Sequence, residues 1–428
     1  MKRLLLILTV LGLSLCGQLV KNGDFSLGEG EEVSNWKLGV GPGGVVEGAN
    51  RGIYVIGEGQ DCTYWLSDPV PFSSNGTYRI RFRARGVKAG NGTAVTGPVF
   101  ANIDIGCPKG DWREYTNVFV APKNVGGENS RIRLGQWHSR GRIEFDDVSV
   151  VPVHAIYHSE GGMVLGEGEK VSVSGYECQL QFGGAGRNHS RVLAEHNCGF
   201  NTNRWFFGEN SYVTYCHQIG GRTQGSGKLE LAVNYHVGGA LKVEASRDGS
   251  NWLEVASKSE QGQVEVDLPA SLYPAEKIWI RLSAVSGKKV GAKDSDPGSF
   301  QVNSYKYAAS VSGTPTEVVG STQYFEERVS STGLEASILG IGDGLPGGAN
   351  VVRIKAKNTS GKAISLVPSV TLTKEHATKC DKFDGAKVDL PAGGETELTV
   401  QYEVPGTGKW ELQAFVSAGG EIVSAFAT

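Results

Sequence analysis

Apolar and polar residues alternate with a period of two along most of the chain. In residues 77–85, four apolar side chains fall on one face and four arginines on the other. Such alternation is typical of an antiparallel strand with one face buried. Asn-Gly pairs at 75–76 and 91–92 mark turns on either side. Because no amphipathic helix of useful length interrupts this pattern, the sequence predicts an all-β protein of packed sandwiches.

The chain is long enough for several domains. At roughly 100–200 residues per domain, its 428 residues allow two to four. Strand patterns recur in 18–153, in 154–315 (at 228–233 and 241–246) and in 316–428 (at 350–357 and 397–402). The short strands of the last region are typical of an immunoglobulin-like sandwich. We therefore predict three β-sandwich domains with these boundaries.

Residues 1–17 have the pattern of a secretory signal peptide. Lys2 and Arg3 precede an apolar run from Leu4 to Leu15, which is too short to span a membrane. Ser14 and Cys16 offer small residues for cleavage after Cys16, and the same stretch resembles a lipobox, which makes Cys16 a possible lipid anchor. We expect a protein that is secreted or held at a bacterial cell surface.

The composition of the chain limits the classes of function to consider. Glycine contributes 61 residues, about twice the usual share, as in turn-rich β-proteins. The formal net charge is −3, and removal of Lys2 and Arg3 lowers it by two more. A weakly acidic chain has no general attraction to nucleic acid, and no later apolar run is long enough for a transmembrane helix.

Two acidic motifs bracket the first domain. Residues 20–25 read Val-Lys-Asn-Gly-Asp-Phe, and residues 143–150 read Ile-Glu-Phe-Asp-Asp-Val-Ser-Val. The terminal strands of a sandwich usually lie side by side, so the two motifs are expected to meet. This arrangement resembles the jelly-roll carbohydrate-binding modules of the cellulose- and xylan-binding type. The resemblance covers roughly the first third of the chain and implies a sugar-binding role.

The same resemblance implies a structural Ca²⁺ ion. Members of this family hold the ion between the first strand and an acidic residue of the last, and Ca²⁺ prefers carboxylate and carbonyl oxygens. Carried over to this chain, the ligand candidates are Asn22, Gly23, Asp24, Asp146 and Asp147. On a regular strand only one of Asp146 and Asp147 faces inward.

Modules of this type bind sugars by stacking on exposed aromatic rings. The resemblance therefore directs attention to the aromatic residues of the first domain and their polar neighbours. The ligand candidates are Trp36, Tyr64, Trp65, Gln136 and Trp137. Burial in the core is the alternative for each ring, because aromatic side chains dominate core packing.

The arginine stripe at positions 79, 81, 83 and 85 has two interpretations. Guanidinium groups bind uronate or sulfate groups in a bidentate manner. The alternative is a solvated sheet face with cross-strand ion pairs.

Residues 247–252, Arg-Asp-Gly-Ser-Asn-Trp, resemble a hairpin of discoidin-like and other galactose-binding-like sandwiches. This resemblance implies that the second domain is a further sandwich of that class.

Six cysteines follow Cys16, and export favours disulfides. Cys62 and Cys107 are alone in the first domain and form the first predicted pair. Cys198–Cys216 is the second, and Cys178 and Cys380 remain unassigned. Six cysteines allow 15 connectivities, so sequence does not decide among them.

These features predict an exported, non-catalytic glycan-binding protein. The sequence contains no G-x-S-x-G, H-E-x-x-H or P-loop motif, although an enzyme with an inter-domain site stays open. The other alternative is a structural or adhesive envelope protein whose sandwiches act as spacers.

Overall fold

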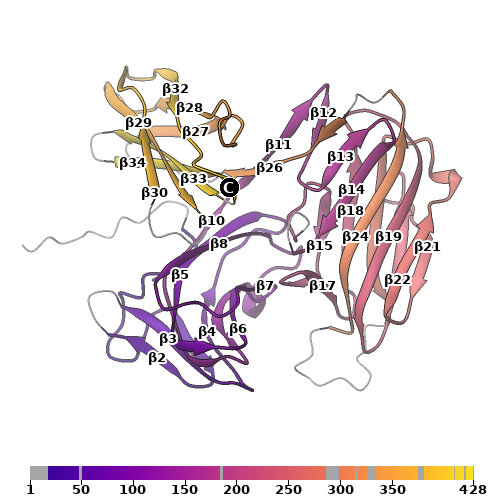
Figure 1. Ribbon diagram of the computed structural model, residues 1–428, viewed down its shortest axis with the longest axis horizontal. Coiled ribbons are helices and arrows are strands. Elements are labelled where there is room, and N and C mark those ends of the chain that lie inside the picture. The colour runs from indigo at the N-terminus through magenta and orange to yellow at the C-terminus, as the bar shows by residue number, and fades with distance from the viewer. Residues whose placement is uncertain are drawn as a thin grey trace, which may run out of the picture.

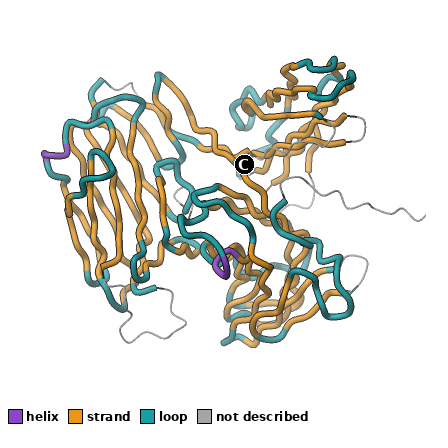
Figure 2. Tube along the Cα trace, turned by 180° about the vertical axis from the view of Figure 1, so that it is seen from behind, coloured by secondary structure: helices purple, strands orange, loops and turns teal. Residues whose placement is uncertain are grey.

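The computed structural model describes residues 18–47, 51–183, 187–285, 298–313, 317–325, 333–374, 380–408, 410–418 and 421–427. The predicted signal peptide and the lipidation site at Cys16 lie outside these residues. Within them, all helix is confined to two 3₁₀ turns, Gly127–Ser130 and Ala270–Leu272, and strands form the rest of the regular structure (Figure 2). The predicted fold class is confirmed: tandem jelly-roll-type sandwiches precede an immunoglobulin-like sandwich. None of the described helices could cross a membrane.

The first sandwich packs two layers of five strands, named here the front and back sheets. In order, the front sheet holds β1 (Trp36–Val40), β4 (Cys62–Pro69), β9 (Arg131–Trp137), β6 (Thr93–Pro98) and β7 (Ala101–Asp104). The back sheet holds β2 (Gly43–Val46), β3 (Gly52–Glu58), β10 (Arg140–Pro152), β5 (Thr77–Gly90) and β8 (Arg113–Val120).

The predicted alternation of buried apolar and outward-facing arginine side chains in β5 is confirmed. Tyr78, Ile80, Phe82 and Ala84 are buried between the sheets. The chain's opening segment also lies beside the closing strand β10. Leu19 donates its backbone N–H to the Val150 carbonyl (2.9 Å), and the Val148 N–H bonds the Gly23 carbonyl (2.8 Å). The expected meeting of the two acidic motifs is therefore confirmed.

The second sandwich has its own two layers. One consists of β15 (Leu193–His196), β18 (Tyr212–Gln218), β23 (Lys277–Val285), β20 (Ala240–Ser246) and β21 (Leu253–Lys258). The other centres on β24 (Phe300–Val311), with β19 (Gln224–His236) and β22 (Gly262–Asp267) on one edge and β14 (Gly175–Gln181), β13 (Glu169–Ser172) and β25 (Glu317–Val319) on the other. Because β25 pairs with β13, this layer extends past residue 315.

The 247–252 segment forms a tight turn between β20 and β21. The Asp248 carboxylate accepts the backbone N–H groups of Ser250 (2.7 Å) and Asn251 (2.8 Å), and these bonds hold its pKa well below the usual range. Gly249 adopts a positive φ of 73°, which favours glycine.

A short ladder joins the first two sandwiches. The hairpin of β16 (Gly199–Asn201) and β17 (Arg204–Phe207) pairs with β24 on one side, and β16 pairs in parallel with β7 on the other. The front sheet therefore continues through β7, β16 and β17 into the β24 layer as one sheet of 13 strands (Figure 1). One set of buried apolar side chains, from Val20 to Val318, underlies both sandwiches.

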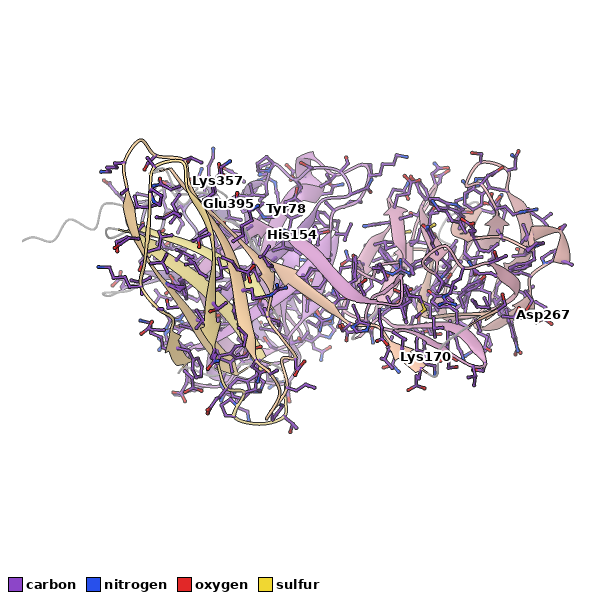
Figure 3. All side chains as sticks on the ribbon, turned by 90° about the horizontal axis from the view of Figure 1, so that it is seen from above. Tyr78, His154, Lys170, Asp267, Lys357 and Glu395 are labelled. Atoms are coloured by element: carbon purple, nitrogen blue, oxygen red, sulfur yellow. The ribbon has the colours of Figure 1, made fainter. Side chains whose placement is uncertain are left out.

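The third sandwich has a separate core, which runs from Leu334 to Val416. Its sheets are β27 (Leu334–Gly340), β28 (Val351–Asn358) and β32 (Glu395–Gln401), and β30 (Cys380–Asp384), β29 (Ile364–Lys374), β33 (Trp410–Ala418) and β34 (Glu421–Ala427), with β31 (Val388–Leu390) beside β29. A small sheet of β11 (His154–Glu160), β12 (Met163–Leu165) and β26 (Thr322–Phe325) lies between the sandwiches. In Figure 3 the third sandwich, marked by Lys357 and Glu395, lies over the first, and the second stands apart.

The shared sheet and core predict that the first two sandwiches unfold together. Phe200 is fully buried in β16 and packs edge-on against Trp205, with ring centroids 5.1 Å apart. Phe200→Ala should destabilise both sandwiches by about 3–5 kcal/mol. Hydrogen exchange followed by mass spectrometry should show lost protection in both 18–153 and 187–313, and none in 333–374.

The matched control is Leu366→Ala in the third core, where Leu366 is fully buried. It should lower protection in the third sandwich alone. Loss of protection in only one of the first two sandwiches after Phe200→Ala would show that they are independent units.

Candidate functional site

The outer face of the back sheet is occupied by its own ion pairs. Arg81 pairs with Glu114 (2.8 Å), Arg83 with Asp147 (3.0 Å) and Arg85 with Glu144 (2.6 Å). The guanidinium groups of Arg83 and Arg85 also lie over the Trp112 ring, at 5.3 and 4.8 Å from its centroid. Buried Arg79 donates to the Thr116 hydroxyl (2.8 Å). The arginine stripe therefore follows the second interpretation, a sheet face with cross-strand ion pairs.

The outer face of the front sheet differs, because an aromatic ring lies flat on it. Tyr64 of β4 faces outward between Gly39 of β1 and Gly135 of β9. A Cβ at Gly39 would come within 2.8 Å of the Tyr64 ring, and one at Gly135 within 2.5 Å of the Tyr64 Cβ. Glycine at position 39 leaves room for the ring, and glycine at position 135 leaves room for the Thr63 carbonyl and the Tyr64 Cβ.

Arg133 of β9 lies beside Tyr64, with its guanidinium 5.8 Å from the ring centroid. Its Nη2 donates to Asn102 Oδ1 (2.8 Å), whereas its Nε is buried without a partner among the described residues. Burial lowers the pKa of this guanidinium. None of the described carboxylates forms an ion pair with it, in contrast to the paired arginines of the back sheet. A ligand at Arg133 would therefore have no ion pair to displace.

Trp137 completes this face at the end of β9. It is 45% exposed, the most exposed tryptophan among the described residues, and it stacks on His138 with ring centroids 4.4 Å apart. Tyr64, Arg133 and Trp137 alternate on the same side of neighbouring strands, with Tyr64 opposite Gly135 and Cys62 opposite Trp137. We call Tyr64, Arg133 and Trp137 the front-sheet site.

Three of the predicted ligand residues are buried, and their ligand role stays a prediction. Trp36 and Trp65 also line a groove of about 440 Å³. Trp65 is 3% exposed and donates its indole N–H to the Tyr54 carbonyl (3.0 Å) on the back sheet. Trp36 packs edge-on against Phe25 and donates to the Lys21 carbonyl (3.2 Å). Buried Gln136 accepts from the Ser139 N–H (2.9 Å). These side chains fasten the two sheets, the opening segment and the β9–β10 turn.

Strand parity explains why these residues are buried and why Arg133 was not among the predicted residues. Tyr64 and Trp65 are neighbours on one strand, so only one can face outward. Likewise Gln136 shares the core face of β9 with Ile132 and Leu134. Arg133 could have been predicted from the alternation between Arg131 and Trp137, because every second residue of this strand faces outward.

The residues predicted to bind Ca²⁺ lie near one another, at the meeting of the opening segment and β10. Asp146 is 5% exposed, and its carboxylate is 3.9 Å from Arg83 Nη1. Burial and then the charge of Asp147 raise its pKa to about 6, and Asp24 also contributes. Asn22 instead holds the following loop, donating to the carbonyls of Leu27 (3.0 Å) and Ser34 (2.7 Å).

Regular alternation breaks at Asp147. This residue has a positive φ of 51°, and the pairing of β10 with β5 shifts register between Asp146 and Ser149. This bulge returns Val148 to the core side, the side of Phe145, and leaves Asp147 exposed. Within the described residues, no three His, Cys, Asp or Glu side chains are grouped to hold a metal. A cation here would therefore need backbone oxygens as well as Asp146.

Neither predicted disulfide is present in the structure, where Cys62, Cys107, Cys198 and Cys216 are free thiols. Cys198 is buried, whereas Cys216 lies on the outward side of β18, between the buried Tyr215 and His217. Cys198 itself lies in the short link between β15 and β16. Cys62 lies on the outer face of the front sheet, and Cys107 packs against the core. Cys178 is buried and also free, and the side chain of Cys380 lies outside the described part of the chain.

Comparisons with known proteins give similarities of low score. No family model matches the chain, and no curated protein matches its sequence. Among solved structures, the N-terminal CBM22-1–CBM22-2 tandem domain of Paenibacillus barcinonensis Xyn10C covers 69% of this chain and 98% of its own, with 11% identity and a TM-score of 0.26.

A family 16 carbohydrate-binding module covers 31% of this chain and 99% of its own, with 17% identity and a TM-score of 0.25. A β-glucuronidase from Bacteroides uniformis covers 52% of this chain and 26% of its own, with 9% identity and a TM-score of 0.17. The fold given above therefore rests on the strand order and register of this chain.

The raised pKa of Asp146 predicts a pH-dependent loss of stability without added cation. A carboxyl whose folded pKa of about 6 exceeds its unfolded value of about 3.9 favours folding when protonated. Its contribution is present below pH 4 and lost as the pH rises through 6. In chelator, Asp146→Asn should have a higher urea midpoint than the wild type at pH 7, and the difference should vanish near pH 4.

Ser149→Ala, three residues along the same strand, is the control for a change at this end of β10. A wild type that stays at least as stable as Asp146→Asn at pH 7 would contradict the prediction.

Proposed function

We propose that this protein is an exported, non-catalytic glycan-binding protein whose front-sheet site binds polysaccharide. The observation that supports this proposal is the outward-facing Tyr64 ring, for which Gly39 leaves room, next to a guanidinium that forms no ion pair with a described carboxylate. An aromatic face binds the C–H side of a sugar ring, and Arg133 donates hydrogen bonds to its hydroxyls or to an acidic substituent. Trp137 provides a second exposed ring on the same face.

The cost of displacing what already occupies each surface favours the front sheet over the back sheet as the ligand site. A ligand on the back sheet would have to displace hydrogen-bonded ion pairs such as Arg85–Glu144, which leaves a buried charge unpaired at high cost. A ligand on the front sheet only has to displace water from Tyr64 and Trp137 and adds a partner for Arg133. Preformed sites with few polar groups bind without such a penalty.

Removal of the Tyr64 ring should weaken polysaccharide binding without disturbing the fold. Affinity electrophoresis of the full chain in xylan, mixed-linkage β-glucan and polygalacturonate should show retarded migration for at least one polymer. Tyr64→Ala should weaken that binding by about tenfold or more, roughly 1.4 kcal/mol. Arg133→Ala should have a similar effect.

Tyr54→Ala is the matched control, because Tyr54 lies on the back sheet under the Arg142 guanidinium, 3.8 Å from its ring centroid. It should bind as the wild type does. Equal affinities for wild type and Tyr64→Ala would exclude this face, and failure to bind any polymer would favour the rigid-spacer alternative.

We further propose that a Ca²⁺ ion occupies the junction beside Asp146. This buried carboxylate is repelled by Asp24 and Asp147, and its compensation is the Asp147 backbone N–H (2.8 Å) and a distant arginine. The donor set suits a hard cation, since carboxylate and backbone oxygens are what Ca²⁺ prefers. Such an ion would clamp the opening segment to β10 and leave the front-sheet site free.

Calcium should therefore stabilise the wild type by mass action. At pH 7, addition of CaCl₂ after EGTA treatment should raise the melting temperature of the wild type, and Asp146→Asn should abolish most of that rise. Equal shifts in both proteins would place any bound Ca²⁺ elsewhere.

A further inference from the structure

The front-sheet site and the second sandwich share one face of one continuous sheet. Arg133, Asn102 and Asn201 follow one another on this face. Arg133 donates to Asn102 Oδ1 (2.8 Å), and Asn102 Nδ2 donates to Asn201 Oδ1 (3.0 Å) across the β7–β16 ladder. Asn201 in turn lies opposite Arg204 of β17. A ribbon of polar side chains therefore crosses from the first sandwich to the second.

This ribbon ends at a hollow on the second sandwich. The hollow has a volume of about 400 Å³, and its lining includes Gln179, Gln181, Asn203, Gln263 and Asn303. Asn203 belongs to the β16–β17 turn, so it connects the ribbon to the hollow. The amides of Gln179, Gln181 and Gln263 have no hydrogen-bond partner within the described residues and are free to meet a ligand.

A bulge in β24 directs Asn303 at this hollow. Ser304 lies opposite Ala232 and Val302 opposite Val233, so Asn303 is the extra residue. It sits where β24 changes neighbour from β17 to β14. Bulges of this kind re-aim a side chain. A further hollow of about 480 Å³ continues along the same face, lined by Lys170 and Asp267, which are labelled in Figure 3.

Three buried polar atoms along this face lack a partner among the described residues: Arg133 Nε, Arg204 Nε and Asn303 Oδ1. Buried polar atoms are normally hydrogen-bonded, so each exception calls for an explanation. These atoms are closed to solvent, so a linear ligand rich in hydroxyl groups would contact the exposed polar groups around them and not the atoms themselves. Ion pairs border the hollow as well: Lys306, which lines it, pairs with Glu177 (3.1 Å), and Glu230 lies 3.8 Å from Lys228.

We propose that a single linear glycan chain binds along this face, from Tyr64 on the first sandwich to the amide hollow on the second. This inference rests on the proposed function and adds its ligand class: an extended chain rather than a single sugar or a chain end. Six strand steps separate β4 from β24, which at about 4.8 Å per strand amounts to roughly 30 Å. The rigid junction holds both halves at this spacing, so their contributions to affinity combine.

The length of the ligand tests this inference. Isothermal titration of the full chain would use the dimer and octamer of the polymer that binds best, with xylo- and cello-oligosaccharides as the first probes. The octamer should bind at least about tenfold more tightly than the dimer. The double variant Gln179→Ala, Gln181→Ala should remove most of that gain and leave dimer affinity unchanged, because both glutamines are exposed and remote from Tyr64.

Gln401→Ala is the matched control, since Gln401 is an exposed glutamine in β32 of the third sandwich. It should change neither affinity. An octamer that binds no more tightly than the dimer, or a double variant that retains the full gain, would overturn the single-chain inference. If the dimer still bound in a Tyr64-dependent way, the proposed function would remain supported. If no probe bound at all, both the proposed function and the single-chain inference would be contradicted.

Discussion

The parallel ladder between β7 and β16 is the constraint on which the arrangement of this protein depends. Only two residue pairs form it, Ala101 with Phe200 and Asn102 with Asn201. Backbone pairing fixes side-chain direction, so Phe200 points to the core beside Ala101 while Asn201 points to the outer face beside Asn102. The same ladder thus merges two hydrophobic cores on one side and aligns two polar surfaces on the other. Other bonds cross the same junction: Lys123 donates its backbone N–H to the His196 carbonyl (2.7 Å), and Asn188 Nδ2 donates to the Val120 carbonyl (3.1 Å).

Electrostatics distinguishes the two outer faces of the first sandwich. The back sheet carries the arginine stripe, which the sequence alone allowed as a binding surface for acidic ligands. Cross-strand carboxylates pair with Arg81, Arg83 and Arg85 of that stripe. Charge count alone is therefore a poor guide to function. Arg133 is the informative arginine because burial lowers its pKa and no described carboxylate forms an ion pair with it, although the charge of Asp104 acts on it from a distance. Its neighbour Tyr64 is the reason why the proposed ligand site lies on the front sheet.

Local patterning predicted much of this structure. Period-two alternation identified β5, and the two acidic motifs correctly placed the opening segment beside β10. Alternation applied strictly would also have separated Tyr64 from Trp65 and Gln136 from Trp137, because neighbours on one strand face opposite sides of the sheet. The bulge at Asp147 was not predictable, because a left-handed residue resets the alternation without a glycine to mark it. The pairing of β7 with β16 could not be predicted from the sequence either. It joins segments about a hundred residues apart through backbone groups that every residue carries.

The β7–β16 ladder also has a consequence for the first sandwich in isolation. A sandwich cut off after residue 153 would end its front sheet at β7, with a row of backbone N–H and C=O groups that β16 now occupies. Bare edges of this kind recruit other strands, and proteins normally cover them to avoid self-association. The second sandwich therefore acts as an intramolecular edge cover. Polymerisation of a truncated form through this edge would reflect the missing neighbour and not a property of the intact protein.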